Sequence, residues 1–174
     1  MEKQIPEYEK LGISNDFMFG HIMLDADICK RFLEVLLDIK IDHIEYIEPQ
    51  KVLDPKVDAR SVRFDIYVDG GKVVYNCEMQ TTNNRNLPKR TRYYQGMIDI
   101  NLIHKGDDYD DLKKSFVIFI CTFDPFKQGS YVYTFRNVCK EFPDLELGDE
   151  TVKVFFNTKG TKGNISPEVN YSDL

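Results

Sequence analysis

The most constraining feature of this sequence is a run of alternating polarity from Val62 to Gln80, interrupted by Gly70-Gly71. Alternating apolar and polar residues on both sides of a Gly-Gly pair predict two antiparallel β-strands joined by a tight turn. If the turn has two residues, Val68 lies opposite Val73. A shift of this register by two residues would leave every side chain on its face, whereas a shift by one would reverse them all.

The alternation places Asp65 and Glu78 on the same face of the hairpin. Successive side chains of a strand point to opposite faces, so the two residues are expected as diagonal neighbours, roughly 7–8 Å apart at the backbone. The expected polar face comprises Arg63, Asp65, Tyr67, Asn76, Glu78 and Gln80, and the expected apolar face comprises Val62, Phe64, Ile66, Val68, Val73, Tyr75, Cys77 and Met79.

Two interpretations of this carboxylate pair are open from the hairpin alone. Converging carboxylates can hold a divalent cation, because Mg²⁺ prefers hard oxygen ligands, and such an ion can activate water and neutralise charge on a phosphodiester. Alternatively, Asp65 and Glu78 lie on a solvated sheet face, with Arg63 paired to Glu78 across the strands.

The order and spacing of several segments resemble a known nuclease family. Asp65, then twelve residues, then Glu78-Met79-Gln80 resembles the core of the PD-(D/E)XK nuclease superfamily, in which a lysine stands at the position of Gln80. Over about residues 11–165, the chain resembles the Rpn-type recombination-promoting nucleases, also described as PD-(D/E)XK family transposases. The segments that carry this resemblance are Asn15 to Phe19, Arg90 to Tyr94, and Gly106 with Tyr109 before the apolar run Phe116–Cys121.

This resemblance implies a restriction-endonuclease-like α/β sandwich, in which a mixed sheet with an antiparallel hairpin is flanked by helices. It also implies a DNA endonuclease that hydrolyses phosphodiesters with Mg²⁺ or Mn²⁺. A neutral amide can position water but cannot offset developing charge, so Arg90 is the candidate for the missing positive charge and Gln80→Lys should be tolerated. The implied catalytic residues are Asp65, Glu78, Gln80 and Arg90, and the implied metal ligands are Asp65, Glu78, the Met79 carbonyl and Asp16.

A basic cluster follows the Glu-x-Gln strand. Pro88 suits the first turn of a helix, and the amides at a helix start favour an anion. Simpler explanations stay open for individual residues: helix capping for Asp16, a solvated charge or ion pair for Arg90, and packing for Tyr94. The expected DNA-binding residues are Arg85, Lys89, Arg90, Arg92 and Tyr94.

Periodicity predicts the remaining elements. Ser14 and Asp25 are expected to cap two helices, the second of which runs to about Leu37. Pro88 should open a helix that ends near Gly106, and Ser115–Cys121 has the continuous apolar character of a buried central strand. Further strands are expected at His43 to Ile47 with Pro49 ending it, at Tyr131 to Phe135 and at Val152 to Phe156, and polar connections at 52–60, 107–114 and 137–149.

Composition restricts the function classes. The 174 residues suit one domain, with 1–10 as a mobile arm, 157–174 as an irregular tail, and the family's further C-terminal helical region absent. The net charge of −6 disfavours DNA binding through overall charge, although a local basic patch stays compatible with it. No apolar run is long enough to span a membrane and no secretory signal opens the chain, so a cytoplasmic protein is expected. Its cysteines are Cys29, Cys77, Cys121 and Cys139, of which three lie in apolar patterns typical of buried thiols.

Three functional hypotheses remain. The first is a metal-dependent DNA endonuclease, and the second is a weak or inactive nuclease-fold module that binds DNA or a protein partner, as the missing lysine favours. The third is a purely structural interaction domain. The histidines show no shared spacing for zinc, and no Gly-rich phosphate loop indicates a nucleotide cofactor. A homo-oligomer is compatible with each hypothesis.

Overall fold

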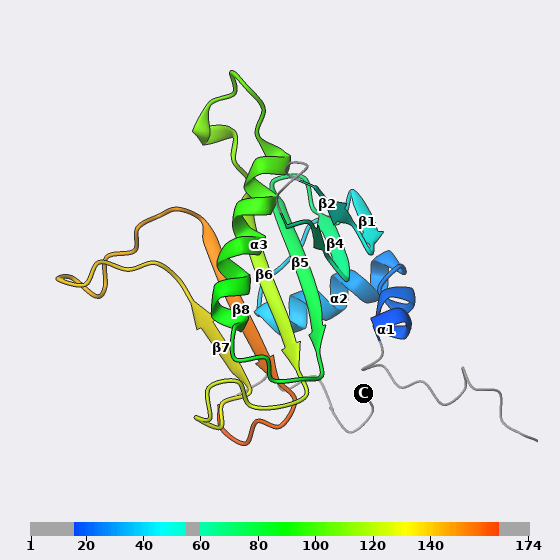
Figure 1. Cartoon of the computed structure of the whole chain (residues 1–174), viewed down its shortest axis with the longest axis vertical. Coiled ribbons are helices and arrows are strands. Elements are labelled where there is room, and N and C mark those ends of the chain that lie inside the picture. The colour runs from blue at the N-terminus through cyan, green and yellow to red at the C-terminus, as the bar shows by residue number, and fades with distance from the viewer. Residues whose placement is uncertain (1–15, 55–59, 164–174) are drawn as a thin grey trace, which may run out of the picture.

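The computed structural model describes residues 16–54 and 60–163, which form a six-stranded mixed sheet with helices on both faces (Figure 1). The strand order is β1-β4-β5-β6-β8-β7. The three central strands β5, β6 and β8 run parallel, and the outer strands pair antiparallel. The strands of this sheet are β1 (Tyr46–Pro49), β4 (Ile66–Asp69), β5 (Val73–Gln80), β6 (Lys114–Cys121), β7 (Val132–Phe135) and β8 (Thr151–Asn157).

The helices cover the sheet as the predicted α/β sandwich requires. In Figure 1, α3 (Leu87–Leu102) crosses one face in front of β6, and α2 (Ala26–Leu37) lies behind the sheet near α1 (Asp16–Ile22). A short 3-10 helix, η2 (Tyr109–Asp111), precedes β6, and a separate two-stranded sheet pairs β2 (Val52–Leu53) with β3 (Val62–Arg63). Among the described residues, no helix is both long and apolar enough to cross a membrane.

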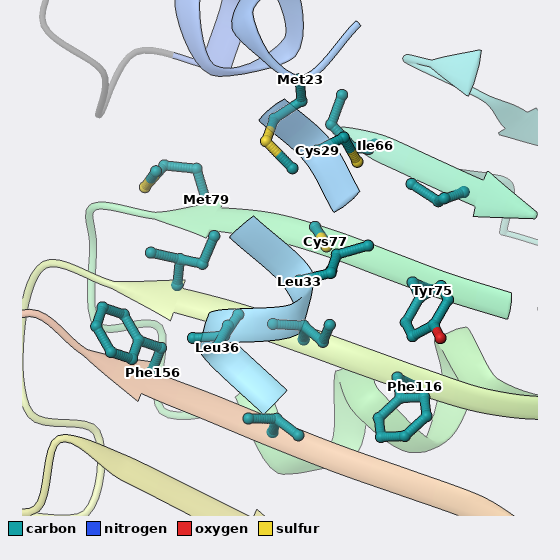
Figure 2. Close-up of a cluster of buried hydrophobic side chains, with 14 of the residues drawn as sticks. Met23, Cys29, Leu33, Leu36, Ile66, Tyr75, Cys77, Met79, Phe116 and Phe156 are labelled. Carbon is teal, nitrogen blue, oxygen red and sulfur yellow. The ribbon is translucent and has the colours of Figure 1, made fainter. Parts of the chain in front are cut away.

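The α2 face of the sheet carries the larger apolar core. Asp25 caps α2 as predicted, because its Oδ1 accepts hydrogen bonds from the N–H groups of Asp27 and Ile28, both at 3.0 Å. Cys29, Leu33 and Leu36 repeat at helical spacing and are buried against the sheet (Figure 2). The strand residues labelled beneath them are Ile66, Tyr75, Cys77, Met79, Phe116 and Phe156.

The opposite face is covered by α3, which has Pro88 in its first turn as predicted. Ile98 packs with Tyr67 and Val117, while Leu87 packs with Phe119 further along the sheet. The helix ends at Leu102 and not near Gly106. His104 instead donates its N–H to Asp107 Oδ2 at 2.7 Å, so a loop side chain satisfies this backbone group outside the helix.

The hairpin has a different register from the predicted one. Val68 pairs with Tyr75, not with Val73, and Asp69 extends β4 opposite Val74. Asp69 is held there by Lys113, whose Nζ donates to both carboxylate oxygens at 2.8 and 2.9 Å. Gly71 takes a φ of +80° in the longer turn. Because the shift is two residues, the faces of β4 and β5 are those expected.

The first strand of the hairpin is broken, although the alternation predicted a continuous one. Phe64 and Asp65 lie outside β3 and β4, and Val62 and Phe64 pack with Tyr67 on the α3 face instead of sharing the other face with Ile66. Backbone bonds to a preceding segment explain the break: Phe64 N–H donates to the Lys51 carbonyl at 2.8 Å, and the Asp65 carbonyl accepts from Gln50 N–H at 3.0 Å.

The other predicted strands are present with shifted ends. β1 begins at Tyr46, three residues later than expected, and ends at Pro49 on the sheet edge. Part of the expected 52–60 connection forms β2.

Cys29, Cys77 and Cys121 are the buried thiols, and burial raises the pKa of Cys29 and Cys121 to about 12. The predicted arm at 1–10, the Ser14 cap and the tail beyond residue 163 lie outside the described residues.

Candidate active site

Asp65 and Glu78 meet on the face of the sheet that α3 covers. Asp65 lies at a bend just before β4, and Glu78 lies near the carboxyl end of β5. Asp65 N–H donates to Glu78 Oε1 at 3.2 Å, while Met79 N–H donates to Asp65 Oδ2 at 2.9 Å. Each carboxylate therefore accepts a hydrogen bond from the backbone of the segment that carries the other, as expected for two side chains on a common face.

The details of this pair correct two expectations. Continuing the β4–β5 register by one residue places Asp65 directly opposite Glu78, not diagonal to it. Asp65 is 9% exposed and Glu78 is 2% exposed, so the interpretation as a solvated sheet face is wrong. Arg63 is exposed on β3, and the cation beside Glu78 is Arg90, at 3.7 Å between Nη2 and Oε2.

Burial disfavours the ionised form of the Glu78 carboxylate. Desolvation, followed by the charge of Asp65, raises the pKa of Glu78 well above its ordinary value. The Asp65 N–H, Arg90 and Asn76 act in the opposite direction but do not cancel this effect. Positive charge near these buried carboxylates favours their ionised forms, as the guanidinium of Arg90 does for Glu78.

Arg90 reaches the pair from the first turns of α3. Its Nη1 donates to Gln80 Oε1 at 2.7 Å, and its Nη2 donates to Tyr94 Oη at 2.8 Å. The guanidinium also lies over the rings of Tyr94 and Phe119, 5.3 and 5.2 Å from their centroids. The alternative of a solvated charge at the helix start is therefore wrong for Arg90.

Gln80 and Tyr94 complete the arrangement around Arg90. The Gln80 amide donates from Nε2 to the Met79 carbonyl at 2.8 Å, so it connects Arg90 with the backbone oxygen that was expected to bind metal. Tyr94 packs edge-on against Phe64, with ring centroids 5.2 Å apart, which confirms the packing interpretation and adds a hydroxyl that holds the guanidinium.

Asn76 is a site residue that the sequence analysis did not single out. It is fully buried on β5, on the same face as Glu78. With its amide nitrogen oriented toward the two acceptors, Asn76 donates to Glu78 Oε1 at 3.0 Å and to the Ile66 carbonyl at 3.2 Å. The sequence feature that indicates a role for Asn76 is its position on the alternating polar face, two residues before Glu78.

The family comparison agrees with this geometry. Residues 14–142 match the family model described as PD-(D/E)XK nuclease family transposase. The chain belongs to this family. No curated protein and no solved structure was found to match it. The match includes both carboxylates, the Glu-x-Gln strand and α3.

The donor set suits the divalent cations that PD-(D/E)XK nucleases generally use. Two carboxylates and the Met79 carbonyl are hard oxygen donors, and burial together with the charge of Asp65 raises the pKa of Glu78. Within the described residues, no group of three or more His, Cys, Asp and Glu side chains could hold a metal ion. The side chain of Asp16 lies outside the described part of the structure. Its helix α1 passes close to β4, because a Cβ on Gly20 would lie 3.9 Å from Ile66 Cδ1.

The expected DNA-binding residues divide into two groups in this PD-(D/E)XK chain. Arg90 and Tyr94 are turned toward the carboxylates. Arg85, Lys89 and Arg92 are exposed, and none of their side chains has a described contact with Asp65, Glu78 or Gln80. Arg85 and Lys89 line an open pocket at the start of α3, together with Asn84, Asn86 and Pro88.

Proposed function

We propose that this chain is a DNA endonuclease that hydrolyses phosphodiesters with Mg²⁺ or Mn²⁺. The observation that carries this function is the buried pair of Asp65 and Glu78, in which Glu78 Oε1 accepts from Asp65 N–H and Asp65 Oδ2 accepts from Met79 N–H; the Met79 carbonyl is a further oxygen donor on the same strand. These three groups would hold the ion, and Asp16 at the start of α1 is a candidate for a further carboxylate ligand. When bound, the ion would activate water and neutralise phosphate charge.

Arg90 would supply the positive charge that the superfamily's lysine provides elsewhere. Its guanidinium is fixed by Gln80 and Tyr94 at the edge of the carboxylate pair, and it is partly exposed, so a phosphate oxygen can approach it. Gln80 would orient the guanidinium and a water molecule without carrying charge itself. Arg85, Lys89 and Arg92 would bind more distant phosphates from the start of α3.

The decisive experiment is a plasmid-cleavage assay with Mg²⁺, Mn²⁺ or EDTA. Asp65→Asn and Glu78→Gln each remove an anionic donor at nearly constant volume, so cleavage should fall to the EDTA background. Asp99→Asn is a matched control, because Asp99 is a half-buried carboxylate further along α3 whose partner is Gln95. If both site variants cut DNA like the parent, these carboxylates are not the ligands.

The second candidate function is a nuclease-fold module that binds DNA or a protein partner without cutting. The observation that favours it is the ion pair of Arg90 with Glu78, since it already places a cation on the carboxylate pair. DNA binding without metal-dependent cleavage would support this function.

We propose that the protein is located in the cytoplasm, because the four cysteines are free and three of them are buried.

A further inference from the structure

The carboxyl ends of the three parallel strands lie side by side. Gln80 at the end of β5 pairs with Cys121 at the end of β6, which pairs with Asn157 at the end of β8. Ligands of open α/β sheets generally bind outside the carboxyl ends of the strands. Glu78 is two residues before this edge, so whatever occupies the loops beyond it is adjacent to the carboxylate pair.

The loops that leave this edge are basic in an acidic protein. The whole chain has 23 basic and 29 acidic residues. In contrast, the segments 81–92, 122–131 and 158–163 together contain seven Lys and Arg residues and a single acidic residue, Asp124. Beyond the cluster at α3, the basic residues are Lys127, Lys159 and Lys162, all exposed, and none forms an ion pair with an acidic residue in the described part of the chain.

Backbone hydrogen bonds join these loops into one surface. Thr122 N–H donates to the Gln80 carbonyl at 3.0 Å, and Tyr131 N–H donates to the Lys162 carbonyl at 3.1 Å. Lys162 N–H in turn donates to the Gly129 carbonyl at 2.9 Å. A Cβ on Gly160 would lie 2.6 Å from Tyr131 Cα, so only glycine permits this close approach. The backbones of the two loops that carry the lysines are therefore held against each other and against the end of β5.

The one acidic residue of this surface is used inside its own loop. Asp124 accepts hydrogen bonds from Gly129 N–H at 2.7 Å, from Lys127 N–H at 2.8 Å and from Tyr133 Oη at 2.8 Å. Although desolvation raises the pKa of Asp124, these bonds lower it below its ordinary value. Lys127 adopts a φ of +58° where the loop wraps around this carboxylate, and its side chain is exposed.

The opposite ends of β6 and β8 have the opposite charge. The segments that lead into the amino ends of these two strands, residues 103–113 and 136–150, contain nine acidic and four basic residues. A polyanion is therefore repelled from the amino ends of these strands and attracted to their carboxyl ends. The charge distribution selects one end of the sheet, even though the net charge of the protein is unfavourable for DNA.

We propose that the phosphate backbone of DNA lies across the carboxyl ends of β5, β6 and β8, where Lys127, Lys159 and Lys162 contact phosphates. This extends the interface from the start of α3 across two further loops. It rests on the proposed function for the identity of the polyanion, but it does not require the bound DNA to be cut. The 122–131 loop is joined to the strand of Glu78, because Thr122 N–H donates to the Gln80 carbonyl, and the 158–163 loop is joined to β6, because Thr158 N–H donates to the Cys121 carbonyl at 3.0 Å.

The test is binding of a fluorescein-labelled DNA duplex by the full chain in EDTA, measured by anisotropy at several salt concentrations. The variant is Lys127→Gln, Lys159→Gln and Lys162→Gln combined, because glutamine removes the positive charge and keeps a polar, unbranched side chain at these exposed positions. The matched control combines Lys72→Gln, Lys105→Gln and Lys140→Gln. These exposed lysines precede β5, β6 and β8, so the control has the same charge change on segments leading into the amino ends.

The variant should bind at least about tenfold more weakly than the parent, and the slope of log affinity against log salt should become shallower by about 2 to 3. The control should keep the parent's slope. The proposal is wrong if the parent does not bind, if the variant retains the parent's affinity and slope, or if the control loses as much as the variant. Loss of cleavage in Asp65→Asn with binding intact would concern the nuclease site alone.

Discussion

Arg90 on α3 donates a hydrogen bond from Nη1 to Gln80 Oε1 over 2.7 Å, and its other terminal nitrogen is 3.7 Å from Glu78 Oε2. The positive charge of this site is therefore carried by the helix, while the strand position that holds lysine in the superfamily carries a neutral amide. This division makes the two side chains interdependent: Gln80 supplies an acceptor that a lysine cannot offer.

The contact changes the expectation for Gln80→Lys. From the resemblance alone, lysine should be tolerated at this position. In the structure, a lysine would face the Arg90 guanidinium and remove its acceptor, so we expect a loss of about 1–3 kcal/mol in the free energy of unfolding and weaker cleavage. Chemical denaturation measures the first effect and plasmid cleavage measures the second.

The double variant Gln80→Lys with Arg90→Gln tests whether the two positions exchange roles. It restores one cation and one neutral amide, so stability and cleavage should recover relative to Gln80→Lys alone. A double-mutant cycle with Arg90→Gln gives the interaction energy between the two positions. Additive effects would show that Arg90 and Gln80 act independently.

Glu78→Gln should separate stability from function. Burial beside Asp65 disfavours the charge of Glu78, so its permanently neutral analogue should unfold at a temperature a few degrees higher in EDTA, corresponding to about 1 kcal/mol. Mg²⁺ or Mn²⁺ should raise the melting temperature of the parent but leave that of Glu78→Gln nearly unchanged, because only the parent binds the ion in its folded state. Equal metal-induced shifts in both proteins would contradict the proposed ligand role.

The sequence was sufficient to identify the facing carboxylates for a specific reason. The side-chain period of a strand is two residues, so the shift of the Val68 partner from Val73 to Tyr75 leaves Glu78 on its predicted face. The break at Asp65 could not be read from the alternation. It depends on hydrogen bonds to Gln50 and Lys51, which precede the hairpin by more than ten residues and pair with it only in the folded chain.

The surroundings of the charged side chains likewise depend on contacts that form only in the folded chain. The spacing of Arg90 and Tyr94 predicts a common helix face, and the structure confirms it. Whether that face meets Glu78 depends on how α3 crosses the sheet, against which it packs through Leu87 at one end and Ile98 further along. Helical spacing alone gives no information about this crossing.

Asn76→Asp should make the protein depend on a divalent cation for stability. The substitution keeps the size of the side chain but replaces the amide donor to Glu78 Oε1 and the Ile66 carbonyl with a third buried carboxylate. We expect a loss of about 2–4 kcal/mol in EDTA, with partial recovery in Mn²⁺. Calorimetric melting with and without the ion checks this. Asn76→Leu removes the donor without adding charge, so its loss of stability relative to the parent should be the same in EDTA and in Mn²⁺.

Asp124→Asn should weaken the fold in a pH-dependent way. The pKa of Asp124 is lowered in the folded protein, so its ionised form stabilises the native state above the ordinary aspartate pKa of about 4, and this contribution is lost as pH falls through the lowered value. The variant should therefore be less stable than the parent at pH 7, and the difference should shrink in acid. Urea denaturation across this pH range measures it. Tyr133→Phe removes the hydroxyl bond to the same carboxylate and the acceptor of the Gln128 and Ser130 N–H groups but leaves the charge of Asp124, so its deficit should depend less on pH. A pH-independent deficit in Asp124→Asn would contradict the assignment.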